Sequence, residues 1–149
     1  MLDGFDRKIL EIIARDARIS ITDLSSKIGL SKTPCHARLK KLEEQGYILG
    51  YCALLDPVKL GREHIAFVEV KLSDTRASAL EAFNKAVLSL PEVEQCHMIA
   101  GGFDYLLKVR TDNIVTYRKI LGEEISSLPN VAQTSTYVSM EAVKDSALL

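Results

Sequence analysis

The sequence lacks the cysteine and histidine patterns that hold metal ions or disulfide frameworks. Its three cysteines, Cys35, Cys52 and Cys96, are scattered, with no Cys-x-x-Cys motif and no histidine pair nearby. Reduced thiols in a cytoplasmic protein explain this usage better than a zinc site or a set of disulfides. We therefore expect no metal site and no cofactor.

The sequence also has little of what directs a chain to a membrane or supports catalysis. The N-terminus has no basic stretch followed by an apolar core, and no window approaches the ~20 apolar residues of a membrane span. There is no nucleophile paired with a base, no pair of carboxylates typical of a cleft and no phosphate loop. These absences predict a soluble, cytoplasmic protein that is not an enzyme.

Charge is small overall but unevenly distributed along the 149 residues. Residues 1–60 carry 10 basic and 8 acidic side chains, whereas residues 61–149 carry 9 and 12. The stretch from Lys27 to Lys41 has five basic residues and no acidic one, which is the local charge that a phosphate backbone attracts. Ordinary solvated surfaces carry such runs too, so the spacing of the residues has to decide.

Three short helices are predicted before Gly46. Apolar residues recur at helical intervals from Asp3 to Arg15, and again from Ile21 to Ile28 after a possible cap at Ser20. From Gly29 to Gly46, Ser31 can cap a helix start and the glycines can turn the chain and end the helix. This order is typical of a helix-turn-helix with a basic second helix, although packed helix pairs also occur in proteins that never contact DNA.

Residues 47–55 favour extended structure, so we expect a short strand or wing beside the helices. Asp56-Pro57 and Gly61 then interrupt regular structure, and the charge balance changes sign at the same place. The sequence therefore predicts a DNA-binding domain at residues 1–55, a linker at residues 56–62 and a second domain at residues 63–149.

The second domain is predicted to have the order βαββαβ. Strands are expected at Ile65–Leu72, Val93–Ala100, Phe103–Arg110 and Val131–Val138. Helices are expected at Ala77–Leu90 and Ile114–Leu128, and Gly101-Gly102 suits a tight hairpin that needs positive φ. The chain is thus an α+β protein whose ferredoxin-like sheet has a second, partly apolar face, which predicts a homodimer.

These segments resemble the Lrp/AsnC family of transcription regulators, also known as leucine-responsive or feast-famine regulatory proteins. The most specific part is GLSKTPCHARLKKLEEQGYILGYCALLDP, and LDGFDRKIL resembles the family's opening helix. In AGGFDYLLKV, Gly101, Asp104 and Tyr105 keep the pattern of the family's effector domain. The resemblance implies a winged helix-turn-helix, a ferredoxin-like effector domain, dimers that assemble further, commonly into octamers, and regulation by small amino acids.

For contact with double-stranded DNA we expect polar side chains of the third helix. Hydroxyl and N–H groups at the helix start can bind phosphate, an arginine can reach a guanine edge, and lysines supply charge. Lys40 and Lys41 can equally pair with Glu43 and Glu44. The expected DNA-binding residues are Ser31, Lys32, Thr33, His36, Arg38, Lys40 and Lys41.

The resemblance implies an effector site beside the hairpin and the last strand. Backbone N–H groups of glycines can approach a carboxylate closely, and an aspartate can accept from an α-ammonium group. From the residues alone, a turn, core packing and ordinary sheet surface explain the same positions equally well. The expected effector-binding residues are Met98, Gly101, Gly102, Asp104, Tyr105, Thr134, Ser135 and Thr136.

We therefore expect a sequence-specific regulator of transcription that responds to a small amino acid and controls genes of amino-acid metabolism. Two alternatives remain open at this point. One is a metabolic enzyme with a regulatory ferredoxin-like domain, and the other is a chromosome-architectural protein with little sequence preference.

Overall fold

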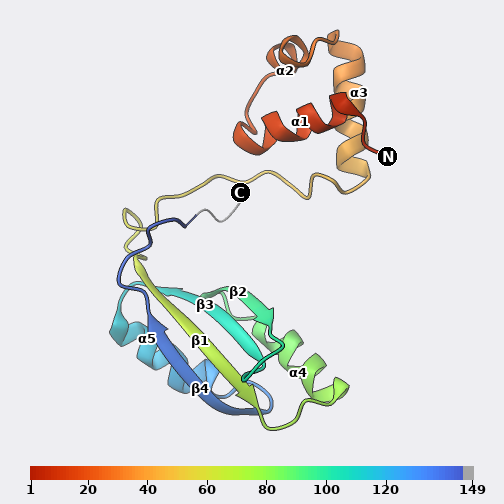
Figure 1. Ribbon diagram of the computed structural model, residues 1–149. Coiled ribbons are helices and arrows are strands. Elements are labelled where there is room, and N and C mark those ends of the chain that lie inside the picture. The colour runs from red at the N-terminus through yellow and green to blue at the C-terminus, as the bar shows by residue number, and fades with distance from the viewer. Residues whose placement is uncertain (146–149) are drawn as a thin grey trace. The chain divides into compact units, whose positions relative to one another are not determined.

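The computed structural model describes residues 1–145, so the last four residues of the expected second domain, 146–149, lie outside the described residues. The chain forms two compact units, Met1–Leu54 and Leu55–Val143. The first is built of helices, and the second is a sheet with helices packed against it (Figure 1). This arrangement confirms the predicted α+β fold class.

The first unit consists of α1 (Gly4–Arg15), α2 (Ile21–Ile28) and α3 (Lys32–Glu44). Apolar side chains at helical spacing meet in one core, which explains why three such short helices are stable together. The buried members of this core are Ile9, Ile13, Leu24, Ile28, Cys35 and Leu42.

Both supporting helices begin with side-chain caps, of which the sequence predicts only the one at Ser20. Asp3 and Asp6 form a reciprocal capping box, in which each carboxylate accepts the backbone N–H of the other residue. Ser20 accepts the N–H of Asp23 in the same way at the start of α2. Gly29 ends α2 with a φ of 78°, a conformation in which a side chain is disfavoured.

The two ends of α3 differ in how they are capped. Ser31 occupies the N-cap position but makes no side-chain capping bond, so its expected capping role is not realised. At the other end Gly46 has a φ of 73°. The N–H of Tyr47 donates to the carbonyl of Leu42 and that of Gly46 to the carbonyl of Glu43, which is the Schellman arrangement.

We expected a short strand or wing after Gly46, and no strand forms there, so the strand was predicted wrongly. Residues 47–56 belong to no helix or strand. Several of their apolar side chains are exposed, including Leu49 at 97% and Leu54 at 72%. Extended residues form a strand only when a neighbour pairs with them, and no described strand does so here. Residues 56–62 then form a turn in which the Asp56 carboxylate accepts the N–H groups of Val58 and Lys59.

The second unit follows the predicted βαββαβ order. Its strands are β1 (His64–Leu72), β2 (Val93–Met98), β3 (Tyr105–Thr111) and β4 (Val131–Val138). Its helices are α4 (Ala77–Val87) and α5 (Ile114–Ile120), which continues as the π-helical segment Leu121–Ile125. The strands pair antiparallel in the order β2-β3-β1-β4, with both helices on one face of the sheet (Figure 1).

The helix-covered face carries the core of this unit. Ala66, Val68, Val70 and Leu72 alternate along β1 and are all buried, as the sequence predicts. Phe83 of α4 is fully buried in the same core. The residues that alternate with them along β1 point to the other side, which we call the open face of the sheet.

The connection between β2 and β3 is longer than the predicted two-residue turn. Met98 pairs with Tyr105, so the residues 99–104 intervene, and the N–H of Ile99 donates to the carbonyl of Asp104 at 2.8 Å. Neither Gly101 nor Gly102 has a positive φ. A two-residue hairpin turn requires that conformation, whereas the longer connection spreads the reversal over ordinary backbone angles.

Candidate DNA-binding helix and effector pocket

The outer surface of α3 presents a polar stripe. At about 100° of rotation per residue, Thr33, His36, Ala37 and Lys40 fall on one side of the helix, and all of them are exposed. Cys35 on the other side is fully buried in the core. Three residues of this stripe, Thr33, His36 and Lys40, are among those that the sequence predicts to contact DNA, whereas Ala37 is not.

The lysines at the end of α3 are only weakly engaged. Lys40 lies 3.7 Å from Glu44, and both side chains are largely exposed, at 67% and 64%, so solvent weakens this ion pair. Lys41 has no ion-pair partner among residues 1–145. Glu43 lies two residues away on the helix, a spacing at which side chains do not face each other, and it accepts a hydrogen bond of 2.6 Å from the Tyr51 hydroxyl. Burial, together with that bond, raises the pKa of Tyr51 to about 12.

Arg38 lies away from the polar stripe and has a different environment from the one expected of a base-reading residue. Its Nη1 donates to Asp3 Oδ2 at 2.6 Å and to Asp6 Oδ1 at 2.8 Å. Its guanidinium carbon lies 5.4 Å from the centre of the Phe5 ring. Two carboxylates of the α1 N-terminus therefore hold the guanidinium in this structure.

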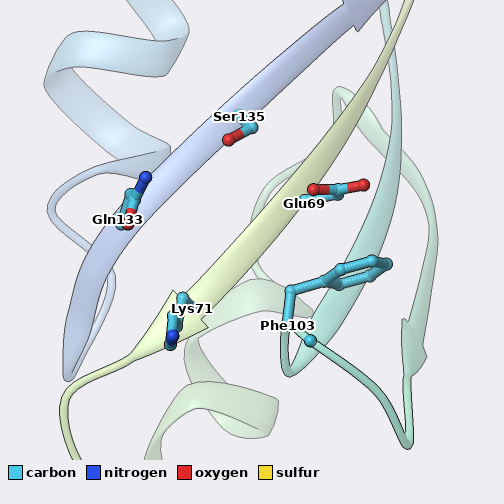
Figure 2. A pocket seen from close by; sticks show the side chains of 6 residues that line it. Glu69, Lys71, Phe103, Gln133 and Ser135 are labelled. Carbon is cyan, nitrogen blue, oxygen red and sulfur yellow. The ribbon is translucent and has the colours of Figure 1, made fainter.

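A small pocket opens on the open face of the sheet in the second unit, with a volume of about 140 Å³. Figure 2 shows side chains of β1 and of the neighbouring β4 converging on it, with Phe103 at the end of the β2–β3 connection. Its lining residues are Glu69, Lys71, Gly102, Phe103, Gln133 and Ser135.

Opposite charges stand side by side in this pocket. Glu69 and Lys71 lie two residues apart on β1, so both side chains point to the open face, about 6–7 Å from each other along the strand. Neither forms an ion pair with another described residue. The pocket therefore offers a carboxylate, an ammonium group and an aromatic ring.

Only two of the expected effector residues, Gly102 and Ser135, line this pocket. Thr134 and Thr136 pair with Val70 and Val68, so they point to the helix-covered face, where Thr136 shares a hydrogen bond with the hydroxyl of Tyr117. Side chains alternate along a strand, so Ser135 points to the opposite face from these two threonines, and its pairing with Glu69 places it on the open face.

Tyr105 and Asp104 are used within the fold. Tyr105 is 1% exposed, its ring centre lies 4.2 Å from that of Phe83, and its hydroxyl donates to Asn84 Oδ1. Asp104 Oδ2 accepts the N–H of Leu72 at 2.7 Å, and its own N–H donates to the carbonyl of Val70. Asp104 therefore fastens the β2–β3 connection to β1.

Met98 and Gly101 do not line the pocket either. Met98 is 56% exposed at the end of β2, and Gly101 is exposed within the connection. Conversely, the sequence reasoning missed Glu69, Lys71, Phe103 and Gln133. The alternation of β1 already placed Glu69 and Lys71 opposite the core, but only the pairing of β1 with β4 shows what lies beside them.

The described residues contain no group of three or more His, Cys, Asp and Glu side chains placed to hold a metal ion. Within residues 1–145 no helix is long and apolar enough to cross a membrane.

Two family models match the two parts of the chain. Residues 2–48 match a winged helix-turn-helix DNA-binding model, and residues 65–149 match the Lrp/AsnC ligand binding domain. The second match covers more than half of the chain and takes in β1 from Ile65 onward together with β2, β3 and β4.

Known proteins are similar over nearly the full length. The proline dehydrogenase transcriptional activator of Rhizobium radiobacter is 62% identical over 147 residues, 99% of this chain and 94% of the relative. The leucine-responsive regulatory protein of Klebsiella pneumoniae is 48% identical over 145 residues, which are 97% of this chain and 88% of the relative. The solved structure of a transcriptional regulator of Neisseria meningitidis in complex with L-Met is also similar, with a TM-score of 0.92 and 30% sequence identity. The similarity covers 100% of this chain and 96% of that structure's chain.

Proposed function

The chain belongs to the Lrp/AsnC family of transcription regulators, which are not enzymes, and on that premise we propose that it binds specific DNA sequences in response to a small amino acid. In this proposal residues 1–55 contact DNA, residues 56–62 link the domains, and residues 63–149 bind the effector and form oligomers. The protein then works in the cytoplasm, where DNA and free amino acids are both available.

The outer stripe of α3 supports the DNA-binding part of the proposal. Thr33, His36 and Lys40 present hydrogen-bonding groups, and the Ala37 methyl group suits contact with a thymine methyl. Phosphates beside the groove are suitable partners for Ser31, Lys32 and Lys41. The Ser31 hydroxyl is available for such a contact because it does not cap the helix. Arg38 is left out because two carboxylates already hold it.

The charged groups in the open-face pocket carry the effector part. An α-amino acid presents a carboxylate and an ammonium group on one carbon, and Lys71 and Glu69 are complementary to these two charges. Phe103 provides an apolar contact for the side chain of the amino acid, and Gln133 and Ser135 add hydrogen-bonding groups.

The relatives suggest which genes and which ligand to test first. Because the relative from Rhizobium radiobacter is named a proline dehydrogenase transcriptional activator, we propose that this chain controls genes of amino-acid metabolism and that proline is the first ligand to test. Methionine is the second, because the similar regulator from Neisseria meningitidis was solved with L-Met.

The open face of the sheet also supports the proposed homodimer. Phe67 and Tyr137 pair across β1 and β4 on this face and are 38% and 54% exposed. A second copy placed over this face would bury them, and two copies present two α3 helices for two half-sites of an operator. Further assembly, up to an octamer, would then depend on other surfaces.

The effector proposal is tested by measuring melting temperatures with each of the twenty amino acids. A ligand that binds the folded state stabilises it in proportion to the logarithm of its concentration, and the melting temperature rises accordingly. Lys71→Met and Glu69→Gln should each remove that shift, whereas Lys85→Met, at an exposed position on α4, should keep it. A shift that persists in both pocket variants would place the effector elsewhere.

The DNA proposal is tested by selecting binding sites from a random duplex library. The selected site should bind on the order of a thousandfold more tightly than random DNA, or better, at the same salt concentration. Equal affinity for both would contradict sequence-specific regulation and favour an architectural protein.

A further inference from the structure

We propose that Arg38 is a positioning residue, which fixes the orientation of the recognition helix α3 through the two carboxylates that cap α1. This inference rests on the proposed DNA-binding role of α3. It assigns Asp3 and Asp6, which lie at the start of the supporting helix, to the machinery that sets DNA affinity.

The geometry at the start of α1 uses each carboxylate oxygen once. Asp3 Oδ1 accepts the N–H of Asp6 at 2.9 Å, and Asp6 Oδ2 accepts the N–H of Asp3 at 3.2 Å. The two remaining oxygens, Asp3 Oδ2 and Asp6 Oδ1, both accept from Arg38 Nη1. The capping box therefore holds the two carboxylates through bonds that do not involve the guanidinium.

This cluster connects the middle of α3 to the first turn of α1. Arg38 lies about 60° around the helix from the fully buried Cys35, so its side chain leaves α3 on the side that packs against the core. Only 32% of that side chain is exposed, and its guanidinium lies over the Phe5 ring. The polar stripe with Thr33 and Lys40 lies on the opposite side.

Apolar packing alone leaves the rotation of a helix weakly specified, because the hydrophobic effect is not directional. Hydrogen bonds from one guanidinium to two fixed carboxylates are directional, and charge strengthens them. The pKa of Asp3 lies below its ordinary value, first because of the N–H of Asp6 and also because of Arg38. Without Arg38, Asp3 and Asp6 would face each other as two unneutralised carboxylates.

The consequence for DNA binding differs from that of removing a direct contact. Once α3 is no longer held, only a fraction of the molecules presents it in the orientation that binds DNA, so affinity falls by that fraction for every sequence. The complex itself keeps the same contacts, so the number of phosphates contacted and the preference at each base pair change little. Removal of a base-reading arginine would instead relax the preference at one position.

The test compares three variants of the full-length protein on the selected operator: Arg38→Ala, the double variant Asp3→Asn with Asp6→Asn, and the combination of all three substitutions. Asparagine keeps an acceptor for the capping bonds but carries no charge for Arg38. Lys41→Ala is the control for a direct phosphate contact, since Lys41 is exposed and has no ion partner among the described residues.

We expect the first two variants to bind the operator roughly tenfold more weakly, and the combined variant to bind no more weakly than either, because all of the substitutions break one unit. The slope of log affinity against log salt should stay at the wild-type value in these variants. In Lys41→Ala it should decrease by about 0.9 for each phosphate that the side chain no longer neutralises. Base preferences, measured by repeating the selection, should be unchanged in every variant.

The aspartate double variant separates the two roles most clearly. It removes negative charge and frees Arg38, so a DNA-contacting arginine would bind equally well or more tightly in this variant. Wild-type or stronger affinity there, or a preference that disappears at one position in Arg38→Ala, would overturn the positioning role while leaving the proposed function intact. If the wild-type protein binds no DNA, both proposals fail.

Melting temperatures of all variants are recorded in parallel. If Arg38→Ala does not fold, Arg38→Lys takes its place. Lysine keeps the charge but lacks the planar guanidinium, so it should recover only part of the affinity. Full recovery by lysine would show that charge alone is needed and would contradict a directional role.

Discussion

Replacing Asp104 with alanine should destabilise the second unit, because this side chain fastens the β2–β3 connection to the central strand. Its Oδ2 accepts the N–H of Leu72 at 2.7 Å, and Leu72 is only 6% exposed. Removing a charged acceptor leaves a buried N–H without that partner, which costs about 1–3 kcal/mol of the free energy of unfolding. For a unit of this size, that corresponds to a fall of roughly 5–15 °C in melting temperature.

The assay is thermal unfolding of the full-length protein, followed through the transition of the second unit. Asp104→Asn is the matched control, since its amide oxygen still accepts the N–H of Leu72, and it should retain most of the stability. If the stability of Asp104→Ala lies within about 0.5 kcal/mol of the wild type, well below the cost of an unpaired buried group, the hydrogen bond does not hold the connection and Asp104 is free to serve the ligand. The same variant should weaken ligand binding, because Gly102 and Phe103 of the pocket directly precede Asp104.

Three other predictions follow from single contacts. Phe83→Ala should lower the free energy of unfolding by about 3–5 kcal/mol in urea titrations, because its fully buried ring packs on Tyr105; a decrease of less than about 1 kcal/mol would contradict this packing. The pKa of Tyr51 is raised to about 12, so its contribution to stability is complete below the ordinary value of 10.0 and disappears as the pH rises toward 12. Ultraviolet titration to about pH 11 should therefore ionise the same number of tyrosines in the wild type and in Tyr51→Phe, and an extra ionisation in the wild type would refute the shift. Hydrogen bonds from the Arg76 side chain lower the pKa of Asp74 to about 2, so its contribution is present above pH 3.8 and disappears as the pH falls toward 2; carboxyl NMR titration should show a return toward 3.8 in Arg76→Gln.

The sequence predicted elements well where a periodic pattern or a cap carries the information. The alternation from Ala66 to Leu72 predicted the buried face of β1, and Ser20 and Gly29 marked the limits of α2. These features depend on residues close together in the chain, so the amino-acid order contains the information that determines them. The resemblance to the Lrp/AsnC family predicted a winged helix-turn-helix followed along the chain by a ligand-binding domain, and the family models confirmed these two kinds of domain in that order.

The structure departs from the expected placement of residues where the outcome depends on residues distant in the chain. The pairing of Val68 with Thr136 and of Glu69 with Ser135 decides which hydroxyl group lies on the open face, and neither strand specifies that register. Arg38 belonged to a basic run, but its partners Asp3 and Asp6 lie 35 and 32 residues earlier. The strand expected at residues 47–55 had a suitable composition but no described neighbour to pair with.

The position of β1 in its sheet affects how the protein forms during synthesis. This strand is made first, yet it is central, and both of its neighbours, β3 and β4, come later in the chain. The sheet therefore stays incomplete until Val138 has left the ribosome, whereas α1, α2 and α3 are complete once Glu44 has been made. The N-terminal helices can fold while translation continues, and a nascent chain would have a structured DNA-binding part before it can sense an effector.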